Sequence, residues 1–155
     1  MTEMTRSPAK VTAIDTQAQA VLTVRTRGED FIDITREVRA FLAETGGRFG
    51  MVFVFCRHTS ASLTIQENAD PDVQIDLLTA LHALAPEDRP WVHHLEGPDD
   101  MPAHVRSMLT DSHLAIPVRE GKLCLGTWQG IYLVEHRAKP LEREIILAFS
   151  GRAAP

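Results

Sequence analysis

Apolar residues along this chain follow two spacings, one typical of strands and one typical of helices. Residues 18–26 alternate between apolar and polar side chains and predict a strand that turns at residues 28–30. The uninterrupted apolar run at 51–56 predicts a buried strand, and residues 62–65 predict a shorter one. Further strands are predicted at 114–118, 122–125, 131–135 and 142–149.

Three segments show the i, i+3, i+4 spacing of amphipathic helices. The first covers residues 34–42, after the capping candidates Asp33 and Thr35. The second follows Asp70, which precedes a proline at the expected first helical position. A third, short helix is predicted to open at Pro102. The positions of the second helix expected to face inward are Val73, Leu77, Leu78, Leu81 and Leu84.

The order of these elements favours an α+β fold. Strands and helices do not alternate steadily, and the last third of the chain is all strand, so mostly antiparallel or mixed sheets are expected. A length of 155 residues suits a single compact domain over residues 1–155, with residues 1–17 partly a loose tail. The final strand is apolar enough to be covered in an oligomer.

Composition narrows the class of function. The net charge is -5, and no Lys/Arg cluster is present to neutralise phosphates, which argues against nucleic acid. No apolar run approaches the roughly 20 residues that span a bilayer. The polar N-terminus has no export signal, so a cytoplasmic protein is expected, with Cys56 and Cys124 as reduced core residues.

Residues 126–132, Gly-Thr-Trp-Gln-Gly-Ile-Tyr, form the most distinctive segment. Glycine on both sides of Trp128 and Gln129 lets the backbone turn tightly or approach a ligand closely. Trp128 offers a flat apolar wall, and Gln129 offers both a donor and an acceptor. A packed tryptophan beside a bulge explains the segment equally well from composition alone.

Two polar segments follow predicted strands, where many folds place functional residues. His58 comes after the strand at 51–56 and could bind a metal or transfer a proton, although a hydrogen-bonded structural role is more common. Arg143 lies a few residues beyond Glu135, and arginine binds phosphate oxygens through two nitrogens. The alternative is a salt bridge of Glu135 with Arg137 or Arg143.

Acidic and amide side chains precede the second predicted helix. Asp70 is placed to cap that helix, and Asp72 favours its N-terminus through the helix dipole. Capping does not account for Glu67 or Asn68, whose oxygens, with Asp76 in the helix, suit Mg²⁺. The segment is therefore a candidate for catalysis or metal binding.

Residues 93–104 begin with two histidines and end with a third, with acids between them. Imidazole and carboxylate groups are zinc ligands, although the spacing from His94 to His104 matches no common zinc motif. We expect His94 and His104 to hold a divalent metal, Zn or Mg, while the adjacent His93 leaves the first ligand open. One of the acids could instead orient a ligating histidine.

Taken together, four ordered motifs resemble those of the YjbQ-like family, also called the secondary thiamine-phosphate synthase family. The motifs are His58-Thr59-Ser60-Ala61, Glu67-Asn68-Ala69-Asp70-Pro71, Glu96-Gly97 followed by Pro102-Ala103-His104, and Leu125-Gly126-Thr127-Trp128-Gln129-Gly130-Ile131-Tyr132. The resemblance runs from residue 18 to residue 151, nearly the whole chain.

This resemblance implies a compact α+β domain that forms a homotrimer, with a polar cavity near subunit interfaces. It also implies weak thiamine-phosphate synthase activity, which joins hydroxymethylpyrimidine diphosphate to thiazole phosphate and releases diphosphate. The loop through residues 99–101 is longer than the corresponding loop in other family members, so the entrance to the site is expected to differ. The matching residues are His58, Glu67, Asn68, Asp70, Asp76, His94, His104, Trp128, Gln129, Glu135 and Arg143.

The chemistry of that reaction suggests roles for these residues. Departure of diphosphate leaves a carbocation, so the leaving group must be stabilised and water excluded. Trp128 would stack on the heterocycle, and Arg143 would hold the thiazole phosphate. His94, His104 and His58 would hold the metal. The expected catalytic residues are His58, Glu67, Asn68, Asp70 and Gln129.

Two other functions use the same residues. A metal-dependent hydrolase of a small phosphorylated or amide metabolite would need the same histidines and a carboxylate such as Glu67. A non-catalytic metabolite-binding protein would need only the cavity. An enzyme is the favoured interpretation, with a small phosphorylated metabolite as its substrate.

Overall fold

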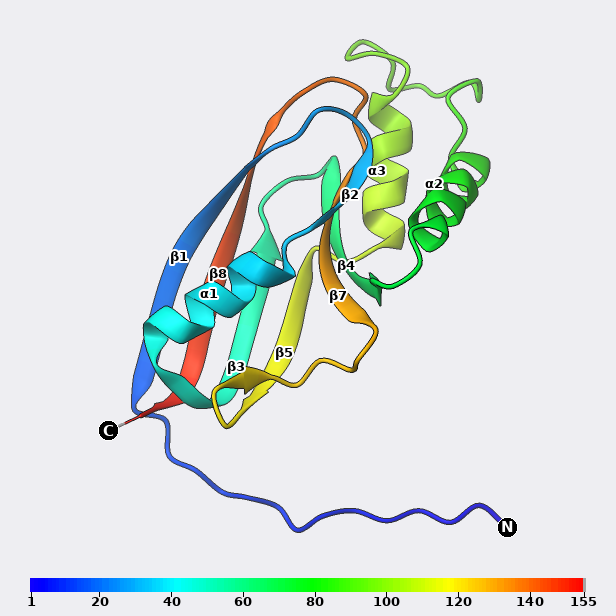
Figure 1. The fold of residues 1–155 in the computed structure, drawn as a ribbon. Coiled ribbons are helices and arrows are strands. Elements are labelled where there is room, and N and C mark those ends of the chain that lie inside the picture. Colours follow the sequence, from blue (N-terminus) through cyan, green and yellow to red (C-terminus); the bar gives the residue numbers. More distant parts are fainter. Residues whose placement is uncertain (155) are drawn as a thin grey trace.

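The computed structural model describes residues 1–154 as a single α+β domain with two antiparallel sheets (Figure 1). The larger sheet has the order β1-β8-β3-β5-β6, and the smaller has the order β2-β7-β4. All neighbouring strands run antiparallel, as the order of elements predicts. The strands are β1 (Thr16–Arg25), β2 (Asp30–Asp33), β3 (Gly47–Cys56), β4 (Ala61–Glu67), β5 (His113–Arg119), β6 (Lys122–Leu123), β7 (Gln129–Glu135) and β8 (Glu142–Ala153).

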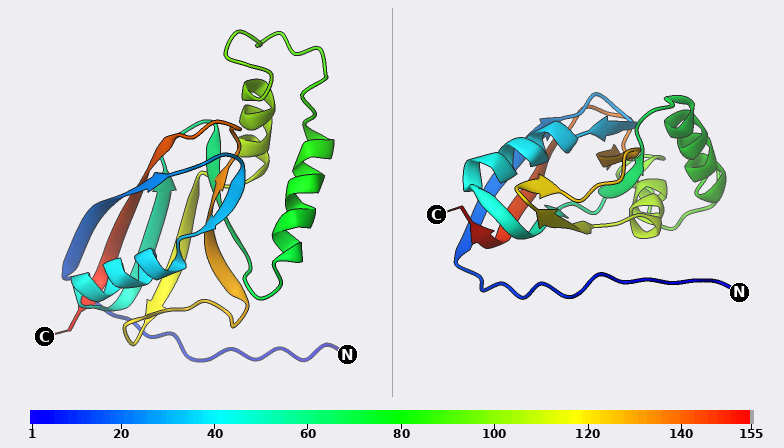
Figure 2. Two further views of the ribbon diagram at one scale, coloured as in Figure 1. Left: turned by 45° about the horizontal axis from the view of Figure 1, so that its top comes forward. Right: turned by 60° about the horizontal axis from the view of Figure 1, so that its bottom comes forward.

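The main core lies on one face of the five-stranded sheet. Helix α1 (Thr35–Thr45) crosses that face, as Figures 1 and 2 show, and the three-stranded sheet extends the cover. Val52 and Val54 of β3 are fully buried there, as are Leu63 of β4 and Leu133 of β7. Truncating one of these leucines to alanine would cost about 2–5 kcal/mol, because a cavity would remain.

Helix α1 begins and ends close to the predicted boundaries. The side chain of Asp33 accepts a hydrogen bond from the backbone N–H of Thr35 at 2.8 Å. At the other end, Gly46 adopts the left-handed conformation with φ 66° and donates its N–H to the carbonyl of Ala43. A left-handed residue of this kind ends a helix with little strain when it is glycine.

Strand pairing separates two segments that are neighbours in sequence. Strand β6 pairs with β5 in the larger sheet, while β7 pairs with β2 and β4 in the smaller one. The segment that contains Trp128 therefore crosses from one sheet to the other and does not close a hairpin. Strand β2 is an additional element at residues 30–33, directly after the predicted turn.

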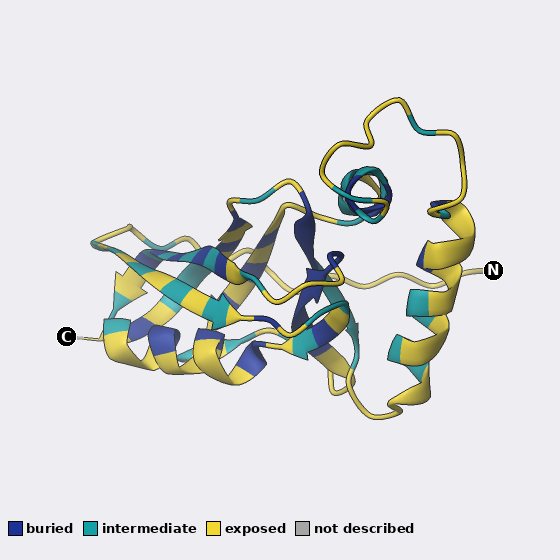
Figure 3. Cartoon of the chain, turned by 90° about the horizontal axis from the view of Figure 1, so that it is seen from above, coloured by how far each residue is buried: buried dark blue, intermediate teal, exposed yellow. Residues whose placement is uncertain are grey.

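Helices α2 (Asp72–Leu84) and α3 (Asp100–Leu109) lie outside the smaller sheet (Figure 3). Of the five apolar residues of α2 expected to face inward, Leu81 is buried, Leu77 and Leu78 pack half-buried beside it, and Val73 is half-buried. The expectation is wrong for Leu84, which is 60% exposed. Only one side of α2 meets the domain, where Leu81 packs against β2 and β7. Helix α3 buries Arg106 on its inner side, whereas Met108 is exposed.

The outer face of the five-stranded sheet carries exposed apolar side chains. Phe53 and Phe55 of β3 are 42% and 47% exposed, and Val21 of β1 is 56% exposed. Phe53 and Phe55 alternate with the buried Val52 and Val54, and Val21 occupies an exposed position in the alternation of β1, so all three point away from the core. The face is therefore an apolar surface without cover from α1 or the smaller sheet.

The two cysteines of the chain lie in different environments. Cys56 is a buried free thiol, as predicted, but Cys124 is exposed, so its assignment to the core is wrong. Residues 1–15 lie outside every helix and strand, and Figure 1 shows this tail extending away from the domain. No helix within residues 1–154 has the length and apolar character needed to cross a membrane.

Candidate functional site: a histidine and carboxylate cluster at the start of α3

His93, Asp100 and His104 meet where the loop after α2 joins α3. One ligand atom from each lies within 4.8 Å of the others. Nε2 of His93 is 2.6 Å from Oδ2 of Asp100, and Nε2 of His104 is 3.2 Å from the same oxygen. The Asp100 side chain is only 2% exposed, while the two imidazoles are 45% and 31% exposed. The cluster thus has a buried carboxylate and two accessible rings.

The donor set fits a divalent metal. Nδ1 of His104 donates a hydrogen bond to the carbonyl of Thr59 at 2.8 Å, so its neutral ring keeps a lone pair on Nε2. A backbone carbonyl fixes metal-binding histidines in this tautomer in many proteins. Metal–ligand bond lengths of about 2.0–2.2 Å place neighbouring ligand atoms roughly 3–3.5 Å apart. The 2.6 Å distance between Nε2 of His93 and Oδ2 of Asp100 would therefore have to lengthen only slightly to admit an ion.

Arg137 fixes the orientation of Asp100. Its guanidinium donates to Oδ1 of Asp100, which leaves Oδ2 facing the two imidazoles. Burial alone would raise the pKa of Asp100, but the hydrogen bond from His93 and the charge of Arg137 contribute to lowering it below the usual range. Asp100 is therefore held as a carboxylate, the form that binds a metal.

The same arginine holds the loop before α3. Its Nε donates to Oδ2 of Asp99 at 3.0 Å, and Nη2 donates to the carbonyl of Glu96 at 2.9 Å. The backbone N–H of Ala138 also donates to Asp99, at 2.9 Å. Neither Asp100 nor Arg137 is among the site residues predicted from the sequence. The available signal was the spacing of Asp100 and His104, which places both on one helix face.

The structure does not bring together the predicted ligands His58, His94 and His104. Of the two adjacent histidines, His93 faces His104, with ring centroids 5.5 Å apart. Nδ1 of His94 instead donates to the carbonyl of Val92 at 2.8 Å. Nε2 of His58 accepts the backbone N–H of Glu144 at 2.8 Å, so this nitrogen is already engaged.

Arg143 lies in a buried ion pair beside this cluster. Nε and Nη2 of Arg143 donate to the two oxygens of Glu135 at 2.7 and 2.6 Å, and Nη2 also donates to Ser60. Burial alone would raise the pKa of Glu135, but hydrogen bonds from Arg143, Thr26 and the Arg137 backbone lower it. Arg143 is thus committed to Glu135, the salt bridge considered as the alternative to phosphate binding.

A second buried network lies beneath α3. Nε2 of His136 is 2.8 Å from the hydroxyl of Ser62, which also bonds the hydroxyl of Thr110 at 2.5 Å. Burial and, secondarily, the charge of Arg106 lower the pKa of His136 to about 4. His136 is therefore neutral at pH 7. Since Ser62 is fully buried, this pair has no access to a substrate.

The remaining predicted residues gather at the opposite end of β4 and β7. Glu67 pairs with Gln129 in the sheet, whereas the other end of the same ladder pairs Ala61 with Glu135. Seven residues of strand separate these ends by roughly 20 Å. The backbone N–H of Asn68 donates to the carbonyl of Trp128 at 3.0 Å, and the Trp128 side chain is 62% exposed.

Two further predicted residues in this region serve local structure. Oδ1 of Asp70 accepts the N–H of Asp72 at 2.9 Å, which is the expected capping role at α2. Oε1 of Gln129 accepts the N–H of Gly126 at 2.8 Å and so closes its own turn. Within one chain, these groups therefore lie far from His104.

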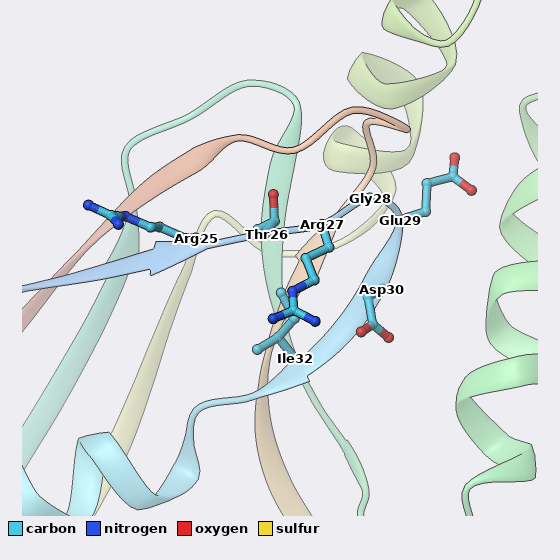
Figure 4. A pocket seen from close by; sticks show the side chains of 7 residues that line it. All are labelled: Arg25, Thr26, Arg27, Gly28, Glu29, Asp30 and Ile32. Carbon is cyan, nitrogen blue, oxygen red and sulfur yellow. The ribbon is translucent and has the colours of Figure 1, made fainter.

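A pocket of about 290 Å³ lies at the turn between β1 and β2 and contains none of the predicted site residues (Figure 4). Its Glu29 accepts a hydrogen bond from Arg106 at 2.6 Å and lies 2.6 Å from Nε2 of His82. Arg25 and Arg27 point in different directions, and Arg25 pairs with Glu142. Glu29 is thus engaged by Arg106 and His82, and the two arginines do not converge on one point.

Comparison with known proteins identifies the family to which this fold belongs. The family model described as UPF0047 protein YjbQ-like matches residues 20–152. The chain is 48% identical over 136 residues to the UPF0047 protein sll1880 of Synechocystis sp., covering 87% of this chain and 92% of that one. It is 37% identical to the UPF0047 protein YjbQ of Escherichia coli O157:H7, covering 86% and 97%. The chain therefore belongs to the YjbQ-like family.

Solved structures agree with this assignment. A YbjQ-like protein of Sulfolobus solfataricus P2 superposes with a TM-score of 0.82 at 29% identity, covering 88% of this chain and 99% of that one. A YjbQ/UPF0047 family protein of Clostridium acetobutylicum gives a TM-score of 0.79 at 40% identity, covering 84% and 98%. The α+β fold is thus shared across the family.

Proposed function

We propose that this protein is a metal-dependent enzyme that acts on a small phosphorylated metabolite in the cytoplasm. The observation that supports this most strongly is the convergence of His93, Asp100 and His104 on one point. These three side chains would hold a divalent cation, Zn²⁺ being the best match to two imidazoles and one carboxylate. When bound, such an ion supplies a positive charge that stabilises phosphate oxygens.

We further propose thiamine-phosphate synthase-type transfer as the reaction, because the four sequence motifs resemble those of the synthase family. In that proposal the diphosphate of the pyrimidine substrate lies at the His93 cluster. The role of Arg137 is to keep Asp100 ionised and correctly turned. The role of Thr59 is to hold His104 in the tautomer that leaves Nε2 free.

We also propose that the chain assembles as a homotrimer. The apolar outer face that includes Phe53 and Phe55 supports an interface between copies, because a monomer would leave these rings in water. Assembly would also matter for the site, since Trp128 and Gln129 lie at the far end of β4 and β7, roughly 20 Å of strand from the end that adjoins His104. A neighbouring copy is the means by which both groups would act on one substrate.

The reaction is tested by incubating the purified chain with hydroxymethylpyrimidine diphosphate, thiazole phosphate and Zn²⁺. Formation of thiamine phosphate that is lost in His104→Ala and kept in His94→Ala supports the proposal. His94 is the matched control, because it is an exposed histidine of the same loop outside the cluster. If the wild-type chain forms no thiamine phosphate from the two substrates in the presence of Zn²⁺, the transferase function is rejected.

A second candidate, a metal-dependent phosphate ester hydrolase, is favoured by Glu96. Its Oε2 lies 3.8 Å from Nε2 of His93, and its side chain is 67% exposed. A carboxylate in this position could take a proton from an attacking water. Zn²⁺-dependent release of phosphate from 4-nitrophenyl phosphate that falls at least tenfold in Glu96→Gln would support this function, while an unchanged rate would exclude the role of Glu96.

A further inference from the structure

A hollow of about 530 Å³ adjoins the metal-binding cluster. Its walls come from the loop before α3 and from the first turn of that helix, at Trp91, Val92, His93 and Met101. The volume falls in the range of roughly 300–1,000 Å³ that small-molecule sites occupy. Apart from His93, the lining side chains are apolar, in contrast to the charged pocket at the turn between β1 and β2.

The hollow and the cluster share one residue. His93 lines the hollow while its Nε2 lies 2.6 Å from Asp100, and Met101 directly follows Asp100 in α3. A molecule in the hollow would therefore have one end at the histidine and carboxylate cluster. Its other end would rest against apolar side chains.

The wall formed by Trp91 is fixed in place. The indole Nε1–H donates to the carbonyl of Pro86 at 3.0 Å, and the guanidinium of Arg89 lies over the ring at 5.3 Å from its centroid. These contacts keep the ring from turning into the hollow and filling it. A rigid aromatic side chain binds a ring with little further loss of conformational entropy.

The loop that carries the two histidines exposes apolar side chains to water. Val92 is 95% exposed and Leu95 is 90% exposed, on either side of the two histidines. Scattered apolar residues are common on protein surfaces, but these two flank a potential metal site in a loop that Arg137 holds in place. A ring bound in the hollow would place apolar surface against Val92, which lines it.

We propose that this hollow binds the aromatic or heteroaromatic ring of a small molecule whose anionic head lies at His93, Asp100 and His104. The inference rests on the proposed metal site but does not depend on the synthase reaction. Within one chain it assigns ring binding to Trp91, whereas the proposed contact of Trp128 would come from a neighbouring copy. The ligand class is a flat ring joined through a short linker to a phosphate, phosphonate or comparable metal-binding group.

The test uses the full-length Trp128→Phe variant, because Trp91 and Trp128 are the two tryptophans of the chain. Zn²⁺ binding is measured first, by calorimetry. The Zn²⁺-loaded protein is then titrated with phenylphosphonate and with methylphosphonate while Trp91 fluorescence is followed. Partial burial of the phenyl ring should make phenylphosphonate bind about tenfold more tightly than methylphosphonate.

Met101→Ala should remove most of this preference without weakening methylphosphonate binding. Met108→Ala is the matched control, because it truncates an exposed methionine of the same helix that does not line the hollow. Equal affinities for the two phosphonates on Zn²⁺-loaded protein would overturn the ring site and leave the metal site standing. Failure to bind Zn²⁺ would overturn both, and neither outcome depends on whether thiamine phosphate is formed.

Discussion

His136 should make the protein sensitive to mild acid. The imidazole is 1% exposed and lies beneath α3, with Nε2 bonded to the buried hydroxyl of Ser62. Burial and the nearby positive charges of Arg106 and Arg143 lower its pKa to about 4, against the opposing effect of Glu135. Protonating His136 in the folded state would place an extra positive charge in the interior.

The size of the effect follows from proton linkage. In the unfolded chain His136 has a pKa of about 6.5, so between pH 6.5 and 4 the unfolded state binds a proton that the folded state does not. The contribution is fully present above pH 6.5 and is lost progressively as the pH falls toward 4. Moving from pH 7 to pH 5 should therefore lower the free energy of unfolding by about 2 kcal/mol through this residue alone.

The assay is urea unfolding, followed by circular dichroism at intervals between pH 7 and pH 5. His136→Gln keeps a polar side chain that does not titrate, so it should remove about 2 kcal/mol of the pH dependence, whatever its stability at pH 7. His113→Gln, at an exposed position of β5, is the control and should leave the pH dependence unchanged. An identical pH dependence in wild type and His136→Gln would refute the reasoning.

Three further predictions concern the ion pairs and the outer sheet face. Glu135→Gln should lower the free energy of unfolding at pH 7 by about 3–5 kcal/mol in urea titrations, because Arg143 would stay buried without its counter-charge. Arg137→Gln should weaken Zn²⁺ binding by about 10–100-fold in calorimetry, because Asp100 would lose the group that orients it. Phe53→Ser combined with Phe55→Ser should convert the proposed trimer to monomers in analytical ultracentrifugation, because the proposed interface would lose its apolar rings.

Each of these has a control and a contrary result. Glu142→Gln removes an exposed carboxylate and should change the free energy of unfolding by less than about 0.5 kcal/mol. An equally small change in Glu135→Gln would contradict the importance of the buried ion pair. Arg137→Lys should retain part of the Zn²⁺ affinity, and full affinity in Arg137→Gln would exclude its positioning role. Met108→Ser alters an apolar surface away from the sheet, so equal dissociation there would argue against the proposed interface.

Much of the fold could be predicted from the sequence, because the patterns that mark individual strands and helices are local. The alternation in β1 and the apolar run in β3 mark a half-covered strand and a strand of the core. The partition into two sheets was not accessible, because the partners of β6 and β7 are chosen by contacts distant in sequence. The orientation of Leu84 was wrong for a similar reason, since helical spacing does not reveal that α2 meets the domain on one side only.

The candidate site could be predicted from the sequence only in part. The histidines and acids that occur together in residues 93–104 predict a metal site there, and His104 does lie in the cluster. The choice of His93 over His94 depends on how the loop turns, which residue spacing does not determine. The link from Arg137 to Asp100 joins residues 37 positions apart, so only the folded chain shows it.

Zn²⁺ titration of the metal-free, full-length chain by isothermal calorimetry tests the central claim most directly. One ion should bind per chain, with binding abolished by His93→Ala and by His104→Ala and preserved in His94→Ala. Binding that survives the loss of both His93 and His104, or no binding to the wild-type chain, would contradict the account.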